Sequence, residues 1–351
     1  MKKGIVLLIL LVAGIILFTV TLKQVGLTAV SDALSLLSLI EILAVLGVLF
    51  TSLVILGTFK WFVILGKHRG KNAFWTLFIA KWVGFSISHV TPAALLGGEP
   101  ARYLIVKNET KIENSYIVSS ILLEKLSLML VFVVVFFVGL FFILTYIDLM
   151  WLTHIFAFLI VIAGAFTTYK LFKKVKKLSE AGGFFHFIIK KLKLDKLSLI
   201  KNNITTMADV EANMRDFFRS HKDRVFKLFL LSILELVVML FSYWLIMHFS
   251  GVNLSVPKLI AIRSMVDASY MTPVPAGLGI LELVQAYVFK SIGLTLASGV
   301  AFSLIFRGLN LFIASIGIAI FTWMQVKYWG RQLLEKVEQF IIKYTNGKNN
   351  H

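Results

Sequence analysis

The chain contains no cysteine, and only five of its 351 residues are proline. The lack of cysteine excludes disulfide bonds, a thiol nucleophile and cysteine-based metal sites. The sequence also lacks the Gly-x4-Gly-Lys-Ser/Thr loop that holds nucleotide phosphates and the His-Glu-x-x-His pair that binds zinc. We therefore expect no cofactor, no metal site and no dedicated catalytic residue.

Charged residues are also scarce, at 15% of the chain, whereas hydrophobic residues make up 58%. The mean hydropathy of +0.88 is higher than a soluble domain needs, so the composition predicts a multi-spanning membrane protein. Long runs of Leu, Ile, Val and Phe predict helices, and the alternation typical of barrel strands is missing. We expect an all-α polytopic protein with about six full spans, near residues 4–22, 38–65, 116–146, 150–172, 228–249 and 293–326.

Basic residues outnumber acidic ones by 36 to 18, and they predict the orientation of the spans. The stretch 60–71 has four basic residues, counting Lys60, and no acid; residues 173–227 have 14 and six, and the tail 327–351 has five and two. Positively charged loops stay in the cytoplasm, so we expect both termini there, with residues 1–22 retained as the first span of a plasma-membrane protein. The net charge of +18 is interpreted as topology and not as a nucleic-acid surface.

The 173–227 loop has two interpretations. Its Phe-Phe-His-Phe-Ile-Ile stretch at residues 184–189 lies between lysine clusters, which favours a basic amphipathic segment on the anionic inner leaflet. An ordinary connecting helix fits the same composition.

Two apolar segments, 73–106 and 257–290, are interrupted by one shared pattern, Pro-Ala-small-Leu-x-x-x-Glu. It begins at residue 92 in the first segment and at residue 275 in the second. A helix break leaves backbone groups unpaired, which lipid tolerates only where the break is buried in protein or lines a wet cavity. The predicted break residues are Pro92, Gly97, Gly98, Pro100, Pro273, Pro275, Gly277 and Gly279.

The loop charges agree with the spans only if each broken segment enters and leaves on one side. Segment 73–106 then dips in from the cytoplasm and segment 257–290 from outside, as an inverted pair of re-entrant hairpins. In the alternative, residues 73–90 or 97–106 cross fully, which would place the 173–227 loop outside, against the charge rule.

The two broken segments belong to a wider repeat at an offset of 183 residues. Trp61 and Ser86 recur at this offset as Trp244 and Ser269. We therefore expect two related halves, at residues 38–146 and 228–326, joined by the span 150–172 and the basic loop.

Ionisable side chains inside apolar segments are candidates for function. Glu99 and Glu282 follow the two breaks, and each is expected to cap the second half-helix, to bind a head group or proton, or to do both. Arg102 lies on the same helical face as Glu99, where it can bind a lipid phosphate or only neutralise Glu99. His89, just before the first break, has two interpretations, a general base or a hydrogen-bonded structural histidine, and the second is favoured.

Arg307 lies in the middle of an apolar helix, where a lone charge is unfavourable by about 3 kcal/mol or more. It therefore requires a partner, and the candidates are Glu124, Glu282 and Asp267. Asp267 can also pair with Arg263, four residues before it on the same helix. We treat Glu124 and Asp267 as further candidate site residues.

The string Gly-Gly-Glu-Pro-Ala-Arg at residues 97–102, followed by Pro-Ala-Gly-Leu-Gly-Ile-Leu-Glu at 275–282, resembles the flippase-like membrane domain of lysylphosphatidylglycerol synthases, and the resemblance extends over most of the chain. The resemblance implies a domain that moves an aminoacylated phospholipid between leaflets. It also implies a soluble C-terminal synthetase domain that uses aminoacyl-tRNA, which is not expected in the short tail 327–351. Stand-alone and glycosyltransferase-linked relatives imply an anionic or polyprenyl-linked lipid as alternative cargo.

Three functions remain open at this point. The first is a flippase-like lipid translocase with a membrane phospholipid or polyprenyl lipid as its partner. The second is an integral membrane phosphatidylglycerol lysyltransferase or a lipid-linked sugar transferase component, although no donor-binding domain is visible. The third is a non-catalytic anchor for a separate synthase or glycosyltransferase. A homo-oligomer is left open, and nucleic acid is not expected as a partner.

Overall fold

The computed structural model describes residues 28, 37–68, 73–91, 97–146, 159, 162–164, 166, 169–170, 173, 204–272, 274 and 277–348, with the backbone alone for 204–207 and 327–348. Within these residues the chain consists of helices and their connections, without a strand. The prediction of an all-α fold is confirmed.

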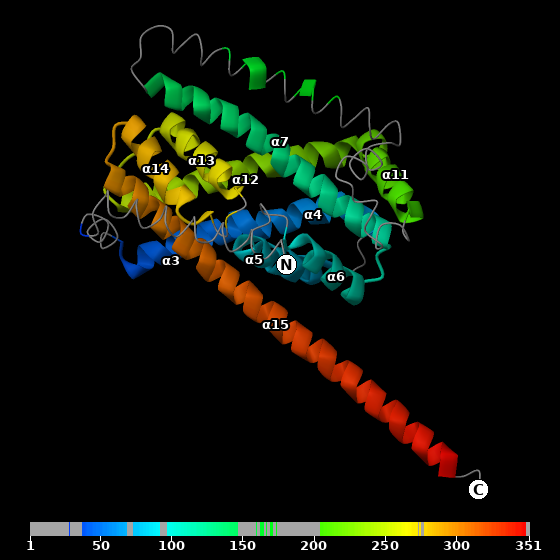
Figure 1. Cartoon of the computed structure of the whole chain (residues 1–351). Helices are drawn as coiled ribbons and strands as arrows, with labels where there is room; N and C mark the ends of the chain where they lie inside the picture. The colour runs from blue at the N-terminus through cyan, green and yellow to red at the C-terminus, as the bar shows by residue number, and fades with distance from the viewer. Residues whose placement is uncertain are drawn as a thin grey trace, which may run out of the picture.

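The helices pack into a bundle crossed by the long helix α7 (Figure 1). In chain order they are α3 (Leu39–Phe50), the π-helical segment η1 (Thr51–Leu56), α4 (Gly57–Leu65), the 3-10 turn η2 (Gly66–His68), α5 (Ala73–Val90), α6 (Glu99–Glu109), α7 (Asn114–Tyr146), α11 (Ile204–Ser220), α12 (Lys222–Phe249), α13 (Val256–Tyr270), α14 (Ile280–Ser291) and α15 (Leu296–Lys348).

Five helical stretches of the described chain are long and apolar enough to cross a membrane, so this is a multi-pass membrane protein. Four of them coincide with predicted spans: Leu39–Leu65, Asn114–Tyr146, Lys222–Phe249 and Leu296–Val326. The fifth, Ala73–Val90, is α5, the first arm of the first broken segment. The predicted spans 4–22 and 150–172 lie wholly or largely outside the described residues.

The continuous helix α3–η1–α4 crosses α12 near the middle of both. Its start is fixed by a capping box, in which the Ser38 backbone N–H donates to the Glu41 carboxylate (2.7 Å) and the Ser38 hydroxyl accepts from the Glu41 backbone. At the crossing, the Ser52 hydroxyl donates to the carbonyl oxygen of Glu235 (3.2 Å). These two residues are 183 positions apart, as are the starts of α3 and α12, at Leu39 and Lys222.

Helices α5 and α6 lie antiparallel and form the first hairpin. The backbone N–H of Gly98 donates to the Ser88 hydroxyl (2.9 Å), and a Cβ on Gly98 would lie 1.8 Å from the carbonyl oxygen of Gly84. Glycine at this position therefore allows the two backbones to touch. Pro100 lies in the first turn of α6, where its missing N–H is tolerated. Pro92 lies outside the described residues.

Helices α13 and α14 form the second hairpin, with a different turn. Gly277 and Gly279 have φ angles of 62° and 76°, a left-handed conformation that glycine adopts without strain. The Gln285 side-chain amide donates to the carbonyl oxygen of Ile262 (3.4 Å), which ties the two arms together. Pro273 and Pro275 lie outside the described residues.

The two hairpins contact opposite ends of α7 and separate positions along α15. On α7, the first hairpin reaches Glu124, whereas α13 packs at Gly139, where a Cβ would lie 2.3 Å from the Ser264 Cβ. On α15, α14 packs against Gly299 and α5 against Gly317. Figure 1 shows the same separation, with α6 and the pair α13–α14 on opposite sides of the bundle.

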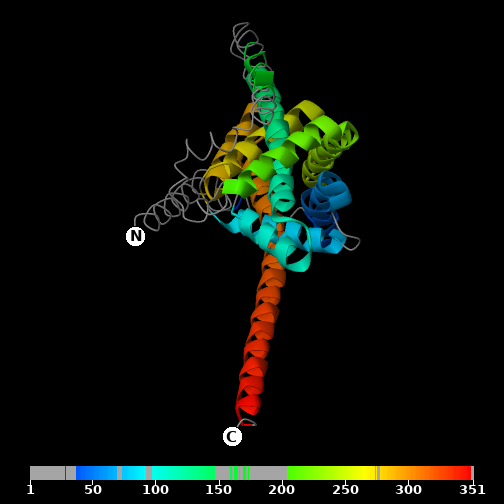
Figure 2. The ribbon, with the colours of Figure 1, turned by 90° about the vertical axis from the view of Figure 1, so that its right-hand side faces the viewer.

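Two further helices extend the bundle at the end where α4 finishes. Helix α11 buries Val210, Met214 and Phe217 against α7 and α12, so this part of the 173–227 loop is a connecting helix packed on the bundle. The stretch 184–189 lies outside the described residues. Helix α15 continues as one rod to Lys348, well past residue 326, and projects from the bundle (Figure 2).

Candidate functional site

Five ionisable side chains meet beside the first hairpin, and we call them the first charge cluster: Lys81, Glu99, Arg102, Glu124 and Lys125. Arg102 donates from Nη1 to Glu99 (2.9 Å) and from Nη2 to Glu124. Glu99 also pairs with Lys125 (2.7 Å), and Glu124 pairs with Lys81. One guanidinium therefore bridges two carboxylates, and each carboxylate holds a lysine on its other side.

Two glycines leave space for the long cationic side chains of the first charge cluster, and one tryptophan packs against a guanidinium. A Cβ on Gly57 would lie 2.2 Å from the Cε atom of Lys81, and one on Gly84 would lie 2.3 Å from the Cγ atom of Arg102. The Trp61 ring lies 4.2 Å from the guanidinium of Arg102, a cation–π contact. Bulkier residues at the two glycines would displace both cations.

The first charge cluster carries one more positive than negative charge and is open on one side. Its three cations face two carboxylates. Glu124 is fully buried, whereas the side chains of Glu99 and Lys125 are 18% and 22% exposed. Since a guanidinium and an ammonium both suit phosphate oxygens, an anion that entered beside Glu99 would balance the excess charge.

The second charge cluster consists of Glu282 and Arg307, beside the second hairpin. The guanidinium and the carboxylate form a two-pronged pair, with N–O distances of 2.5 and 2.7 Å, and Arg307 also donates to the Gly277 carbonyl (3.1 Å). The Gly279 backbone N–H donates to Glu282 (2.9 Å), so this carboxylate caps α14. The cluster is neutral and buried, with Glu282 fully enclosed.

The structure selects among the pairings that the sequence left open. Glu282 is the partner of Arg307, whereas Glu124 pairs with Arg102 and Lys81. Asp267 pairs with Arg263 (2.9 Å), the alternative at helical spacing. The Glu99–Arg102 pair forms, but Arg102 also reaches Glu124 and so does more than neutralise its neighbour. Glu282 caps its helix, whereas the described contacts of Glu99 are ion pairs.

Two buried lysines are absent from the sequence-based site. Lys60, counted with the cytoplasmic loop charges, is fully buried in α4 and pairs with Glu235 of α12. Lys81 lies in α5 and completes the first charge cluster. Lys81 could have been recognised from the sequence, because it is a lone lysine inside an apolar segment. No comparable signal marks Lys60, because it lies five residues before the end of its helix.

The tips of the two hairpins contact each other. The rings of His89, on the last turn of α5, and Tyr270, the last residue of α13, have centroids 5.2 Å apart. The buried Nε2 atom of His89 and the hydroxyl of Tyr270 have no hydrogen-bond partner in the described part of the chain. The expectation of a hydrogen-bonded histidine is therefore wrong at this nitrogen.

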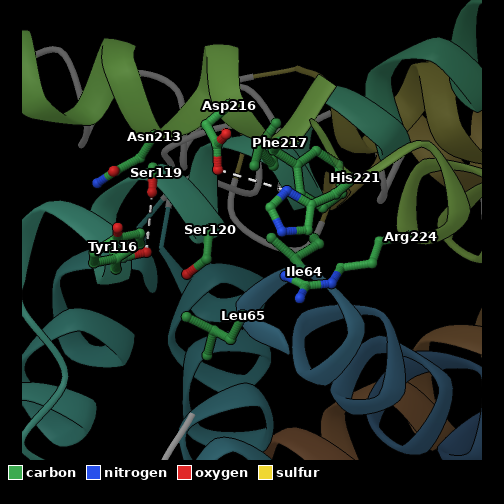
Figure 3. A pocket seen from close by; sticks show the side chains of 11 residues that line it. Ile64, Leu65, Tyr116, Ser119, Ser120, Asn213, Asp216, Phe217, His221 and Arg224 are labelled. Carbon is green, nitrogen blue, oxygen red and sulfur yellow. Dashed lines mark hydrogen bonds and ion pairs between the residues drawn. The ribbon is translucent and has the colours of Figure 1, made fainter. Parts of the chain in front are cut away.

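A small pocket of about 30 Å³ lies where α4, α7, α11 and α12 meet (Figure 3). His221 and Asp216 are neighbours in its lining, with a separation of 3.5 Å between Nδ1 and the carboxylate, and Arg224 lies on the same side as His221. Ser120 also lines the pocket, and its hydroxyl accepts from Trp61 Nε1 (2.7 Å). Because Trp61 stacks on Arg102, one residue separates the pocket wall from the first charge cluster.

Among the residues that the structure describes, no group of three or more His, Asp or Glu side chains is placed to hold a metal ion. A family model described as lysylphosphatidylglycerol synthase TM region matches residues 5–317 of the 351-residue chain. The matched range contains both hairpins and all residues of the two charge clusters. No curated protein and no solved structure matches the chain.

Proposed function

The chain belongs to the lysylphosphatidylglycerol synthase TM region family, and we propose that it moves a phosphate-bearing lipid between the two leaflets of its membrane. The cargo is an aminoacylated phospholipid such as lysylphosphatidylglycerol, or a related anionic or polyprenyl lipid. The observation that carries the proposal is the pair of charge clusters, each built on a broken hairpin inside an apolar bundle. Charged groups at such depth are unfavourable unless they serve a polar pathway.

We further propose that the two halves are an inverted repeat, with the hairpins re-entrant from opposite faces. The helix starts support this: α13 begins at Val256, 183 residues after α5 begins at Ala73. The contact between Ser52 and Glu235 supports it too, because residues at equivalent positions touch only next to a two-fold axis. Inverted repeats with broken helices place substrate sites near the middle of the bilayer.

In this proposal the polar head group travels through the bundle while the acyl chains stay in lipid. The first charge cluster takes the head group from the cytoplasmic leaflet, since its Arg102 and Lys125 donors suit phosphate oxygens and Glu99 and Lys125 are partly exposed. Glu282 and Arg307 hold the outward half of the path. Arg102 is the central group, because its fork can exchange a carboxylate partner for a phosphate.

The proposal is tested by leaflet exchange in liposomes that contain the purified full chain. Lysylphosphatidylglycerol is supplied in the inner leaflet, and a membrane-impermeant amine reagent reports its arrival outside. Arg102→Lys keeps the charge but loses the bridge between Glu99 and Glu124, so we expect exchange about tenfold slower. Arg219→Lys, on the exposed face of α11, is the matched control and should exchange at the wild-type rate.

A polyprenyl phosphate in place of the aminoacylated lipid distinguishes the two cargo classes in the same liposomes, with a membrane-impermeant phosphatase in place of the amine reagent because this lipid has no amine. Faster exchange of one lipid identifies the cargo. If wild-type protein moves neither lipid faster than protein-free liposomes do, the proposed function is wrong.

A further inference from the structure

The contact between His89 and Tyr270 joins the tips of the two hairpins. The His89 ring stacks on Phe85 of its own helix (5.4 Å), and the Tyr270 ring lies against Phe306 of α15 (6.3 Å). Two turns earlier on α5, Trp82 donates from Nε1 to the carbonyl oxygen of Ile313 (2.8 Å), which ties α5 to α15. The two rings are therefore held by three different helices.

Three buried polar atoms around this contact have no hydrogen-bond partner among the residues that the structure describes: His89 Nε2, the Tyr270 hydroxyl and Arg307 Nε. The side chains of His89 and Arg307 are more than nine-tenths buried. Arg307 donates to the carbonyl oxygen of Gly277 (3.1 Å), and a Cβ on Gly277 would lie 3.7 Å from the Tyr270 ring, so the guanidinium and this ring adjoin the same turn. Buried polar groups are almost always paired in folded proteins, so three unpaired ones in one place indicate a site that a ligand completes.

The chemistry of these atoms indicates the ligand. Arg307 uses its two terminal nitrogens on Glu282 and Gly277, which leaves the Nε–H as a donor. The Tyr270 hydroxyl and the His89 imidazole can both donate as well. A group that offers several acceptor oxygens and no donor fits this arrangement, and a phosphodiester is such a group.

We propose that His89, Tyr270 and Arg307 form a central site for the phosphate of a lipid head group, at the meeting point of the two hairpins. This inference rests on the proposed function and extends the second charge cluster, through Arg307, to the tip of the first hairpin. His89 and Tyr270 come from different hairpins, so an occupied site couples the two hairpins through one phosphate.

The test measures equilibrium binding to the full chain in maltoside micelles, which contain no phosphate. The probe is dihexanoylphosphatidylglycerol, and dihexanoylglycerol, with the same tails and no phosphate, is its comparison. Tyr270→Phe removes only the hydroxyl and should weaken binding of the phosphate-bearing lipid about three- to tenfold. His89→Leu should weaken it similarly, and His89→Gln, which keeps a donor, should restore most of the affinity. Tyr287→Phe, at an exposed position of α14, is the control.

Binding of dihexanoylglycerol should be the same in all variants. Equal losses for both lipids would show that Tyr270 and His89 act through packing alone and would overturn the site, as would wild-type affinity in Tyr270→Phe. Inorganic phosphate is tested as a competitor: displacement of the lipid at equal concentration would assign the site to a free anion instead of a lipid.

The outcome is separable from that of the proposed function. If wild-type protein exchanges lipid in liposomes and Tyr270→Phe exchanges it equally fast and binds it equally well, only the central site is wrong. If wild-type protein exchanges no lipid, the transport function is wrong, and the binding comparison still judges the site.

Discussion

The two hairpins present opposite charges to the helices beside them. In the first half, the hairpin supplies Arg102 and the long helix α7 supplies the carboxylate Glu124. In the second half, the hairpin supplies the carboxylate Glu282 and the long helix α15 supplies Arg307. Glu124 and Arg307 are equivalent at the 183-residue offset, so one backbone arrangement accommodates either sign of charge at this position as long as the partner changes with it.

The clusters differ in charge and access as well. The first carries an excess positive charge and is partly open at Glu99 and Lys125, whereas the second is neutral and closed. In the second half Gln285 stands where the first half has Arg102, and Ser264 stands where it has Lys81. Positions related by the 183-residue offset therefore carry different chemistry in the two clusters, which agrees with the proposal that one cluster collects the phosphate of a head group and the other releases it.

The largest difference between the clusters should appear when one charge is removed. Glu124→Gln leaves two buried cations, Arg102 and Lys81, and should lower the free energy of unfolding by about 3–5 kcal/mol. Arg307→Gln should lower the free energy of unfolding by less, because Glu282 keeps its hydrogen bond from the Gly279 N–H. Denaturant titration in micelles measures both, with Asp223→Asn, exposed at 66%, as the control.

A double-mutant cycle tests whether Arg307→Gln lowers the free energy of unfolding because it leaves the Glu282 carboxylate without its partner. The pair Glu282→Gln with Arg307→Gln should be less destabilised than the sum of the single variants, because no buried charge is left alone. If the changes in the free energy of unfolding simply add, Glu282 and Arg307 are not coupled, and the comparison of the two charge clusters is wrong.

Sequence reasoning predicted the parts of the site that depend on neighbours in the chain. The breaks, the Glu99–Arg102 pair and the Arg263–Asp267 pair all follow from spacing within one segment. The partners of Arg307 and Glu124 could only be narrowed to candidates, because the pairing depends on how hairpins lie against α7 and α15. Lys60 was counted with the loop charges, because its neighbours in the sequence do not reveal its partner. That partner is Glu235, 175 residues away, and the pair forms only because α4 crosses α12.

Glycine is required for a different reason in each hairpin, and substitutions can distinguish the two reasons. At Gly98 a Cβ would strike the backbone of Gly84, so Gly98→Ala should lower stability by about 1–3 kcal/mol and Gly98→Asn by more. At Gly277 the space is open, with the nearest atom 3.6 Å from a Cβ, but φ is 62°. Gly277→Ala should therefore lower stability by about 1–2 kcal/mol through backbone strain.

Asparagine distinguishes the two cases, because it tolerates the left-handed conformation better than alanine does. Gly277→Asn should be more stable than Gly277→Ala, and Gly98→Asn less stable than Gly98→Ala, in the same titration. The same order at both sites would show that one cause, space or conformation, governs both turns.

The smallest effect on stability is expected at the open edge of the first charge cluster. Lys125→Gln removes a partly exposed ion pair with Glu99, so the free energy of unfolding should change by less than about 1 kcal/mol. The same change removes the excess positive charge, and exchange of an anionic lipid in liposomes should become slower and less sensitive to salt. Lys290→Gln, on an exposed position of α14, removes an equal charge from the other half and should leave the salt dependence as it is. Equal effects of the two substitutions would mean that the overall charge of the protein, and not the first cluster, attracts the lipid.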